Sequence, residues 1–177
     1  MAEIRRAVEL DPLSMIVLTD EAKELYFRRR YKEAVETYRH SLEVDAQFAI
    51  AYKGLAEVHV QLGKYEEAIR EIETAISLSR RSIFILDDLG YVYARAGMRR
   101  EAQNVQEELE KLSREEYVPA YGRAAICVGL GDRLTAMEWL ERAFEEKGFL
   151  TWIKMDPVFE PLKEEPRFSA LISQIGL

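Results

Sequence analysis

Apolar residues recur every three to four positions along most of this chain, and short polar breaks interrupt them at regular intervals. In the stretch before one such break, four apolar or weakly polar positions share a helical face: Tyr52, Leu55, Ala56 and His59. After Gly63 the same spacing resumes and continues from Tyr65 to Ile76. Positions spaced i, i+3, i+4 and i+7 predict amphipathic helices. We therefore expect short helices joined by tight turns.

The pattern returns every 34 residues, which indicates an internal repeat. Two columns of equivalent positions hold alanine or glycine, namely Ala22, Ala56, Gly90 and Ala124, and Ala34, Ala68, Ala102 and Ala136. A third holds Gly63, Gly97 and Gly131, with Arg29 in the first copy, and a fourth holds Ser41, Ala75, Leu109 and Ala143. Glycine in the third column predicts a helix end with positive φ. Asp132 is expected to cap the helix that follows Gly131.

Gly90 lies inside a predicted helix, where glycine costs roughly 1 kcal/mol relative to alanine. We interpret it as a point of close approach between the two helices of a pair. Helix axes come within about 8–10 Å only when the side chains between them are small. The expected contact joins Gly90 to Ala102.

The residues that carry this period resemble the tetratricopeptide repeat family, whose unit is 34 residues long. The third copy reads Leu86-x₂-Leu89-Gly90-x₂-Tyr93 and continues Ala102-x₃-Gln106. The resemblance implies an all-α fold, a right-handed superhelical solenoid of antiparallel helix pairs with a C-terminal helical cap. Gln106 replaces an aromatic residue of the family pattern, and the closing proline is absent from all four complete copies. We expect these departures to weaken packing between copies.

The period divides the chain into six segments. Complete repeats are expected at residues 15–48, 49–82, 83–116 and 117–150. Residues 1–14 resemble the second half of a preceding repeat, which suggests a piece of a longer array; a natural cap helix is the alternative. Residues 151–177 leave the register and contain Pro157, Pro161 and Pro166, so we expect them to cap the last repeat. Stretches such as DPVFEPLKEEPRF also resemble the C-terminal repeat regions of bacterial and archaeal signalling proteins.

The net charge and the residues with reactive side chains exclude several classes of function. The formal net charge of −7 disfavours binding to nucleic-acid phosphates, and no apolar run is long enough to cross a membrane. His59 and Cys127 fall on predicted buried faces, where packing explains them better than catalysis does. The sequence has no zinc-type Cys/His spacing and no phosphate-binding glycine loop. We therefore expect no enzyme activity, no cofactor and no metal. The single cysteine favours a reducing compartment, and we expect a cytoplasmic protein.

In tetratricopeptide repeat proteins the first helix of each repeat lines the concave surface. Transferred to this sequence, the resemblance gives a candidate partner-binding groove with ten residues: Lys23, Tyr26, Phe27, Lys53, Glu57, Gln61, Asp87, Tyr91, Arg95 and Tyr121. Aromatic rings mixed with charges of both signs suit a peptide. Lys53 alone resembles the family's clamp for C-terminal carboxylates, and its neighbours are acidic. We expect the partner to be a basic segment or an amphipathic helix.

Two functions remain open. In the first, the chain is an interaction scaffold that binds a partner peptide or helix in its groove. In the second, it is the regulatory or self-association region of a larger signalling protein or transcription regulator, with homo-oligomer contacts. A solvated inner wall without a dedicated ligand is the simplest alternative to both.

Ala102→Leu tests the expected contact between the helices of a pair. The larger side chain should force the helices apart and lower the free energy of unfolding by about 1–3 kcal/mol. Thermal unfolding of the variant beside the parent chain measures this loss. A melting temperature unchanged by the substitution would contradict the expected contact.

Overall fold

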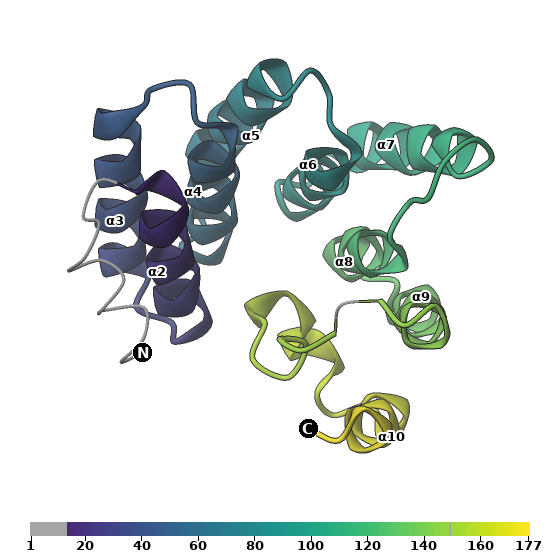
Figure 1. The fold of residues 1–177 in the computed structure, drawn as a ribbon. Helices are drawn as coiled ribbons and strands as arrows, with labels where there is room; N and C mark the ends of the chain where they lie inside the picture. Colours follow the sequence, from purple (N-terminus) through teal and green to yellow (C-terminus); the bar gives the residue numbers. More distant parts are fainter. Residues whose placement is uncertain (1–13, 149) are drawn as a thin grey trace. The chain divides into compact units, whose positions relative to one another are not determined.

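The structure, a computed structural model, describes residues 14–148 and 150–177. Every regular element within these residues is a helix, and they contain no strand. The expectation of an all-α fold built from consecutive helix pairs is confirmed (Figure 1). The chain forms two compact units, Met1–Ile85 and Leu86–Leu177.

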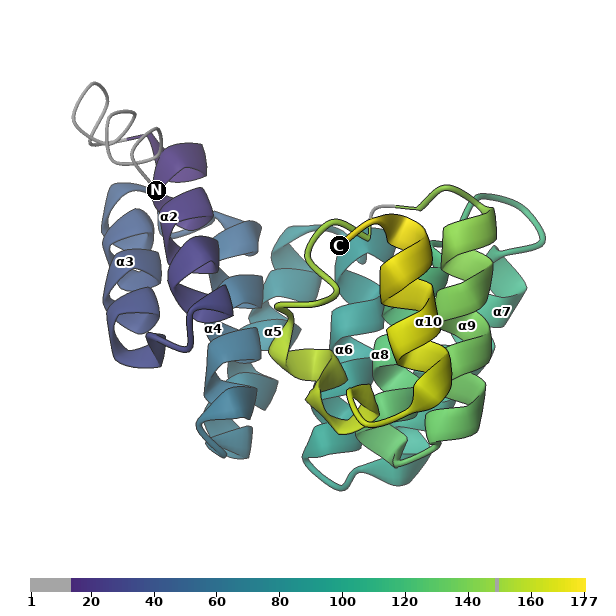
Figure 2. The same cartoon turned by 90° about the horizontal axis from the view of Figure 1, so that it is seen from below.

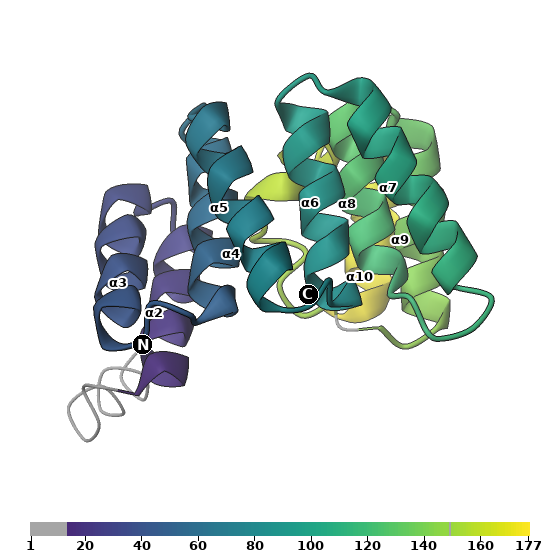
Figure 3. The ribbon, with the colours of Figure 1, turned by 90° about the horizontal axis from the view of Figure 1, so that it is seen from above.

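The first unit contains two helix pairs and the start of a third. Its helices are α2 (Met15–Phe27), α3 (Tyr31–Val44), α4 (Ala49–Gln61), α5 (Tyr65–Leu78) and the first residues of α6 (Ile83–Arg95). Helix α2 packs against α3, and α4 packs against α5 (Figures 1 and 3). Helix α4 also contacts both α3 and α2. The first helices of successive pairs are therefore neighbours in this unit.

The second unit contains the rest of α6 and the C-terminal elements. These are α7 (Arg99–Leu112), α8 (Ala120–Leu130), α9 (Arg133–Glu145), the 3₁₀ helix η1 (Pro157–Leu162) and α10 (Pro166–Ile175). Helix α8 packs against α9, and α10 lies beside α9 (Figure 2). The short helix η1 packs against α8. The C-terminal segment thus contacts both helices of the last pair.

Helix starts follow the period with one exception. Helices α2, α4 and α6 begin at residues 15, 49 and 83, and the second helices begin at 31, 65, 99 and 133. Helix α8 begins at Ala120, three residues later than the stride gives. Pro119 stands at its N-cap with φ −59° and ψ 129°, and proline also disfavours helical geometry in the residue before it. Asp132 caps α9 as predicted, because its side chain accepts a hydrogen bond from the Thr135 N–H at 3.1 Å.

The turn inside each pair is the same in all four copies. The turn residue just after the first helix has a φ of 71°, 80° and 82° at Gly63, Gly97 and Gly131, and of 62° at Arg29. In each copy the N–H of the next residue donates to a carbonyl five residues earlier, as Arg30 does to Leu25 at 2.9 Å. This left-handed conformation favours glycine. The shared hydrogen bonds keep Arg29 in the same turn.

The alanine and glycine columns lie at the centre of the packing. All seven alanines in the two columns are 0% exposed, and Gly90 is buried with them. A Cβ on Gly90 would lie 2.6 Å from Ile126 Cδ1 of α8 and 3.0 Å from Val105 Cγ1 of α7. The three atoms nearest to that position belong to Ile126 and Val105, and not to the expected Ala102. Gly90 therefore makes room for the next helix pair as well as for its own.

Ser41→Ala tests a polar group buried in the fourth column. Ser41 is 0% exposed, and its hydroxyl has no hydrogen-bond partner in the part of the chain that the structure describes. Leaving such a group unpaired costs roughly 1–3 kcal/mol. The free energy of unfolding of the alanine variant, measured in urea, should therefore exceed that of the parent chain by about 1 kcal/mol. Ser77→Ala, at an exposed position of α5, controls for the helix preference of alanine. An equal gain in both variants would contradict the burial argument.

Candidate functional site

Helices α2 and α4 bring three of the predicted groove residues into direct contact. The Lys23 Nζ of α2 lies 2.6 Å from Glu57 Oε2 of α4. The Lys53 Nζ, one turn before Glu57, lies 2.9 Å from Glu57 Oε1. The side chains of Lys23 and Lys53 are 33% and 23% exposed, and that of Glu57 is 9% exposed. One nearly buried carboxylate therefore holds two partly exposed ammonium groups.

The two lysines control the charge of Glu57. Burial alone would raise the pKa of this carboxyl group, because the ionised form is poorly solvated there. The charges of Lys23 and Lys53 and their hydrogen bonds outweigh burial and lower the pKa of Glu57 to about 2. Glu57 is therefore ionised at neutral pH, with both carboxylate oxygens bound by lysine.

Two aromatic rings of α2 contact the ammonium group of Lys23. Its Nζ lies 4.7 Å from the centroid of the Tyr26 ring and 5.1 Å from that of Phe27, distances at which a cation is attracted to an aromatic face. Tyr26 is only 1% exposed and Phe27 7% exposed. Their rings therefore fix the lysine and offer little surface of their own. Gln61, at the end of α4, is half-buried.

In the second unit the predicted groove residues of α6 pack against one another and against α8. The Arg95 Nη1 donates a hydrogen bond to the Tyr91 hydroxyl at 3.0 Å, and Tyr91 is buried. Asp87 lies against Gly122, where a Cβ would overlap the Asp87 Oδ2. Asp87 and Arg95 are half-buried. The buried ring of Tyr91 is thus held by its neighbour one turn along α6.

Tyr121 of α8 contacts the C-terminal segment. Its hydroxyl donates a hydrogen bond to Asp156 Oδ2 at 2.7 Å, and its ring meets Phe159 edge-on with centroids 5.0 Å apart. Asp156 is buried, and its other oxygen accepts from the Val158 N–H at 3.0 Å, which caps η1. Sequence reasoning expected Phe159 to be an apolar anchor of this segment, but it missed Asp156 and the contacts of both residues with Tyr121. The signal was an aspartate directly before a proline, a combination typical of a helix start.

The predicted buried residues with reactive side chains are buried. His59 is 2% exposed, and its Nδ1 lies 2.6 Å from Glu71 Oε2. Cys127 is also 2% exposed, and burial raises the pKa of its thiol to about 11, so it carries almost no thiolate at neutral pH. Within residues 14–148 and 150–177 no group of three metal-ligating side chains lies close enough to hold an ion. In the same residues no helix is long and apolar enough to span a membrane.

Glu57→Gln tests the charge cluster, because it removes the charge and keeps the shape. The folded pKa of about 2 is below the ordinary 4.5, so the stabilisation is complete above about pH 5 and is lost as pH falls towards 2. At pH 7 the free energy of unfolding of the parent chain, measured in urea, should exceed that of the variant by on the order of 2 kcal/mol. This difference should shrink at pH 3. Glu66→Gln, at an exposed position of α5, is the control, and a pH-independent difference for Glu57→Gln would contradict the assignment.

Comparisons with known proteins show which family and which relatives this chain resembles. A family model described as tetratricopeptide repeat matches residues 28–80. Anaphase-promoting complex subunit 3 of Schizosaccharomyces pombe is 22% identical over 139 residues, which are 78% of this chain and 21% of that protein. The chain thus spans about a fifth of the length of this relative.

Solved structures share the fold. MamA matches with a TM-score of 0.54 and 20% identity, covering 81% of this chain and 84% of MamA. YrrB, described as a tetratricopeptide repeat protein with an unusual peptide-binding site, matches with a TM-score of 0.55 and 17% identity, covering 97% of this chain and 89% of YrrB. Residues 28–80 thus match the tetratricopeptide repeat family, and the chain shares the fold of solved structures that include a tetratricopeptide repeat protein.

Proposed function

We propose that this chain is a non-catalytic protein–protein interaction scaffold, which binds a peptide or helix of a partner protein along the first helices of its repeats. Tetratricopeptide repeat proteins in general mediate contacts between proteins and are typically not enzymes. The groove residues on α2 and α4 form the proposed site of the first unit, and those on α6 and α8 form a separate proposed site of the second unit. A cytoplasmic location belongs to the same proposal.

The observation that carries the proposal is the contact of Tyr121 with the C-terminal segment. A first helix of this chain already binds a short non-repeat segment through a hydrogen bond to Asp156 and a ring contact with Phe159. The contact combines one polar anchor with one aromatic anchor, as peptide recognition commonly does. This supports a peptide-binding role for the first helices.

The net charge of Lys23, Lys53 and Glu57 helps to choose between a basic segment and an amphipathic helix as the partner. Two ammonium groups and one carboxylate leave one net positive charge on Lys23, Lys53 and Glu57. This charge gives a basic segment no net attraction, although the acidic sequence suggested one. Between the two expected partners, an amphipathic helix fits the first unit better. The described peptide-binding site of YrrB supports the idea that this fold accommodates a peptide.

One observation favours the alternative, a self-association region. Ile16, Ile50 and Phe84 occupy the same repeat position and are 67%, 46% and 71% exposed. All three belong to the first unit, and each lies at the start of a first helix. Apolar side chains that recur on one edge are typical of an interaction surface. A second copy of the chain is the partner that the alternative requires.

Peptide selection on the 177-residue chain tests the proposed function. Peptides selected from a displayed random library should bind with an affinity that Lys23→Ala and Lys53→Ala each weaken about five- to tenfold, or about 1 kcal/mol. Fluorescence anisotropy with labelled peptides measures the affinity. Lys64→Ala, at an exposed turn position, is the matched control.

Two outcomes would contradict the scaffold proposal. In one, Lys64→Ala weakens binding as much as Lys53→Ala does, so that the contact is non-specific. In the other, no peptide is selected and light scattering shows a stable dimer that Phe84→Glu dissociates. The second outcome would favour self-association.

A further inference from the structure

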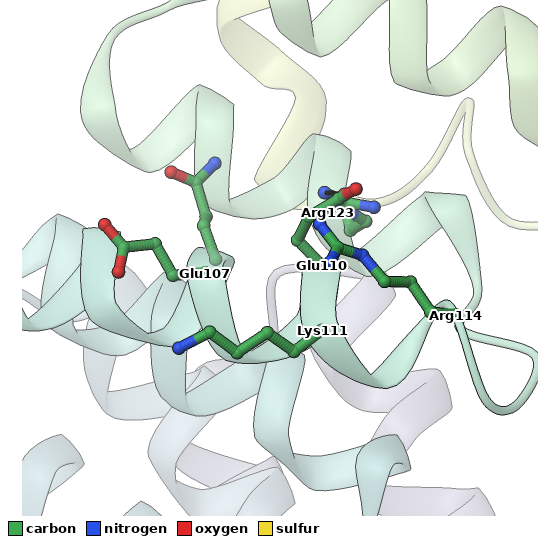
Figure 4. A pocket seen from close by; sticks show the side chains of 6 residues that line it. Glu107, Glu110, Lys111, Arg114 and Arg123 are labelled. Atoms are coloured by element: carbon green, nitrogen blue, oxygen red, sulfur yellow. Dashed lines mark hydrogen bonds and ion pairs between the residues drawn. The ribbon is translucent and has the colours of Figure 1, made fainter.

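An open pocket lies on the second unit, outside the proposed groove. It is lined by Gln106, Glu107, Glu110 and Lys111 of α7, by Arg114 just after that helix, and by Arg123 of α8 (Figure 4). The chain as a whole carries a net charge of −7, yet three of these six side chains are cationic. The pocket therefore differs in charge from the average surface of the protein.

Arg123 is held in a fixed position at this pocket. The residue is 8% exposed, and its Cζ lies 3.8 Å from the ring centroid of Trp139. Its Nη2 donates to Glu110 Oε2 at 2.5 Å. Stacking and hydrogen bonding together leave the guanidinium few alternative rotamers. Among the described residues this is the one hydrogen bond of the Arg123 side chain, and a guanidinium has five N–H donors.

The two neighbouring cations, Lys111 and Arg114, make fewer hydrogen bonds and ion pairs than Arg123 does. The side chains of Lys111 and Arg114 make no hydrogen bond or ion pair within residues 14–148 and 150–177, and both are exposed. In Figure 4, Arg114 and Arg123 converge on Glu110, whereas Glu107 and Lys111 extend to the opposite end of the pocket. The positive charge is thus concentrated at the Glu110 end.

The pKa of Glu110 indicates that the electrostatic potential at that end of the pocket is positive. The pKa of its carboxyl group is lowered by the hydrogen bond from Arg123 and by the charge of Arg123; burial opposes this shift, and the charges of Arg114 and Arg142 add smaller contributions in the same direction as Arg123. A negative group placed there is therefore favoured mainly by Arg123, with smaller contributions from Arg114 and Arg142. Arg142 already pairs with Glu146, Nε to Oε1 at 2.7 Å.

Glu110 itself is a replaceable anion. Its side chain is 51% exposed, and exposed ion pairs contribute little to stability, so releasing it into solvent costs little. A phosphate or a well-oriented carboxylate accepts two N–H groups of one arginine and binds more strongly than a single contact does. The buried, stacked Arg123 provides this geometry in advance.

We propose that Arg114 and Arg123 form a binding site for an oxyanion, the phosphate or carboxylate group of a partner's acidic side chain, which takes the place of Glu110. The released Glu110 moves into solvent, and Lys111 adds positive charge at longer range. This site lies on α7 and α8 and does not use the groove residues, so its failure would leave the proposed groove function unaffected.

The test uses the full 177-residue chain, labelled with ¹⁵N, at constant ionic strength. Its probes are sodium phosphate, the peptide Gly-Gly-phosphoserine-Gly-Gly and the same peptide with serine. The indole N–H of Trp139 is the reporter, and that of Trp152, in the C-terminal segment, is the internal reference. We expect phosphate or the phosphopeptide to shift Trp139 alone, with a dissociation constant on the order of 1 mM. A shift with phosphate assigns the free ion as a ligand, and a shift with the phosphopeptide alone assigns the peptide; either supports the site.

Three variants decide whether the assigned residues bind the anion. Arg114→Gln should weaken binding about fivefold, and Glu110→Gln should tighten it about fivefold because the internal competitor loses its charge. Arg100→Gln, an exposed arginine at the start of α7, removes the same charge elsewhere and should have no effect. The backbone amide spectrum of each variant verifies the fold.

The proposal is overturned if no probe shifts Trp139, if Arg100→Gln weakens binding as much as Arg114→Gln does, or if Glu110→Gln binds no tighter than the parent chain.

Discussion

The close approach of helices through side chains no larger than a methyl group is the constraint on which this structure depends. Seven alanines and Gly90 fill the two columns where helices meet, and the alanines are 0% exposed. A larger residue at any of these points would separate the helix axes or displace a neighbour such as Ile126. Because the first helices α2 and α4 pack together, residues one period apart become neighbours in the first unit. Lys23 and Glu57, 34 positions apart, form an ion pair for this reason.

The charged groups around Glu57 and those around Glu110 differ in their access to solvent. Glu57 is nearly buried between two lysines, so breaking its pairs would leave an ionised group in a poorly solvated place. Glu110 is half exposed beside Arg123, and water can solvate it when it leaves. The first cluster therefore fixes α2 against α4. The second can exchange its internal anion for one from another molecule, provided the arginines stay in place.

In the second unit the C-terminal segment packs on both helices of the last pair. The C-terminal segment packs on α8 through η1 and on α9 through α10, and a terminal repeat needs such cover for its apolar side. The segment achieves this with a buried aspartate that both accepts from Tyr121 and caps η1. One carboxylate thus joins the non-repeat segment to the repeat. The pairing depends on a residue that the 34-residue period does not contain.

The sequence by itself determined the period, the helix pairs, the buried alanine columns and the turn at Gly63, Gly97 and Gly131. These features are local or periodic, and each copy repeats the information. It also placed Arg29 at the same turn, although arginine does not favour that conformation. Only the tertiary structure decided that Glu57 binds Lys23 and Lys53, that Tyr91 is buried, that Ile126 is the neighbour of Gly90 and that Tyr121 contacts Asp156. Each of these contacts joins side chains whose directions depend on the packing of two or more elements, and hydrophobic periodicity fixes the face of a helix but not the partner of a side chain.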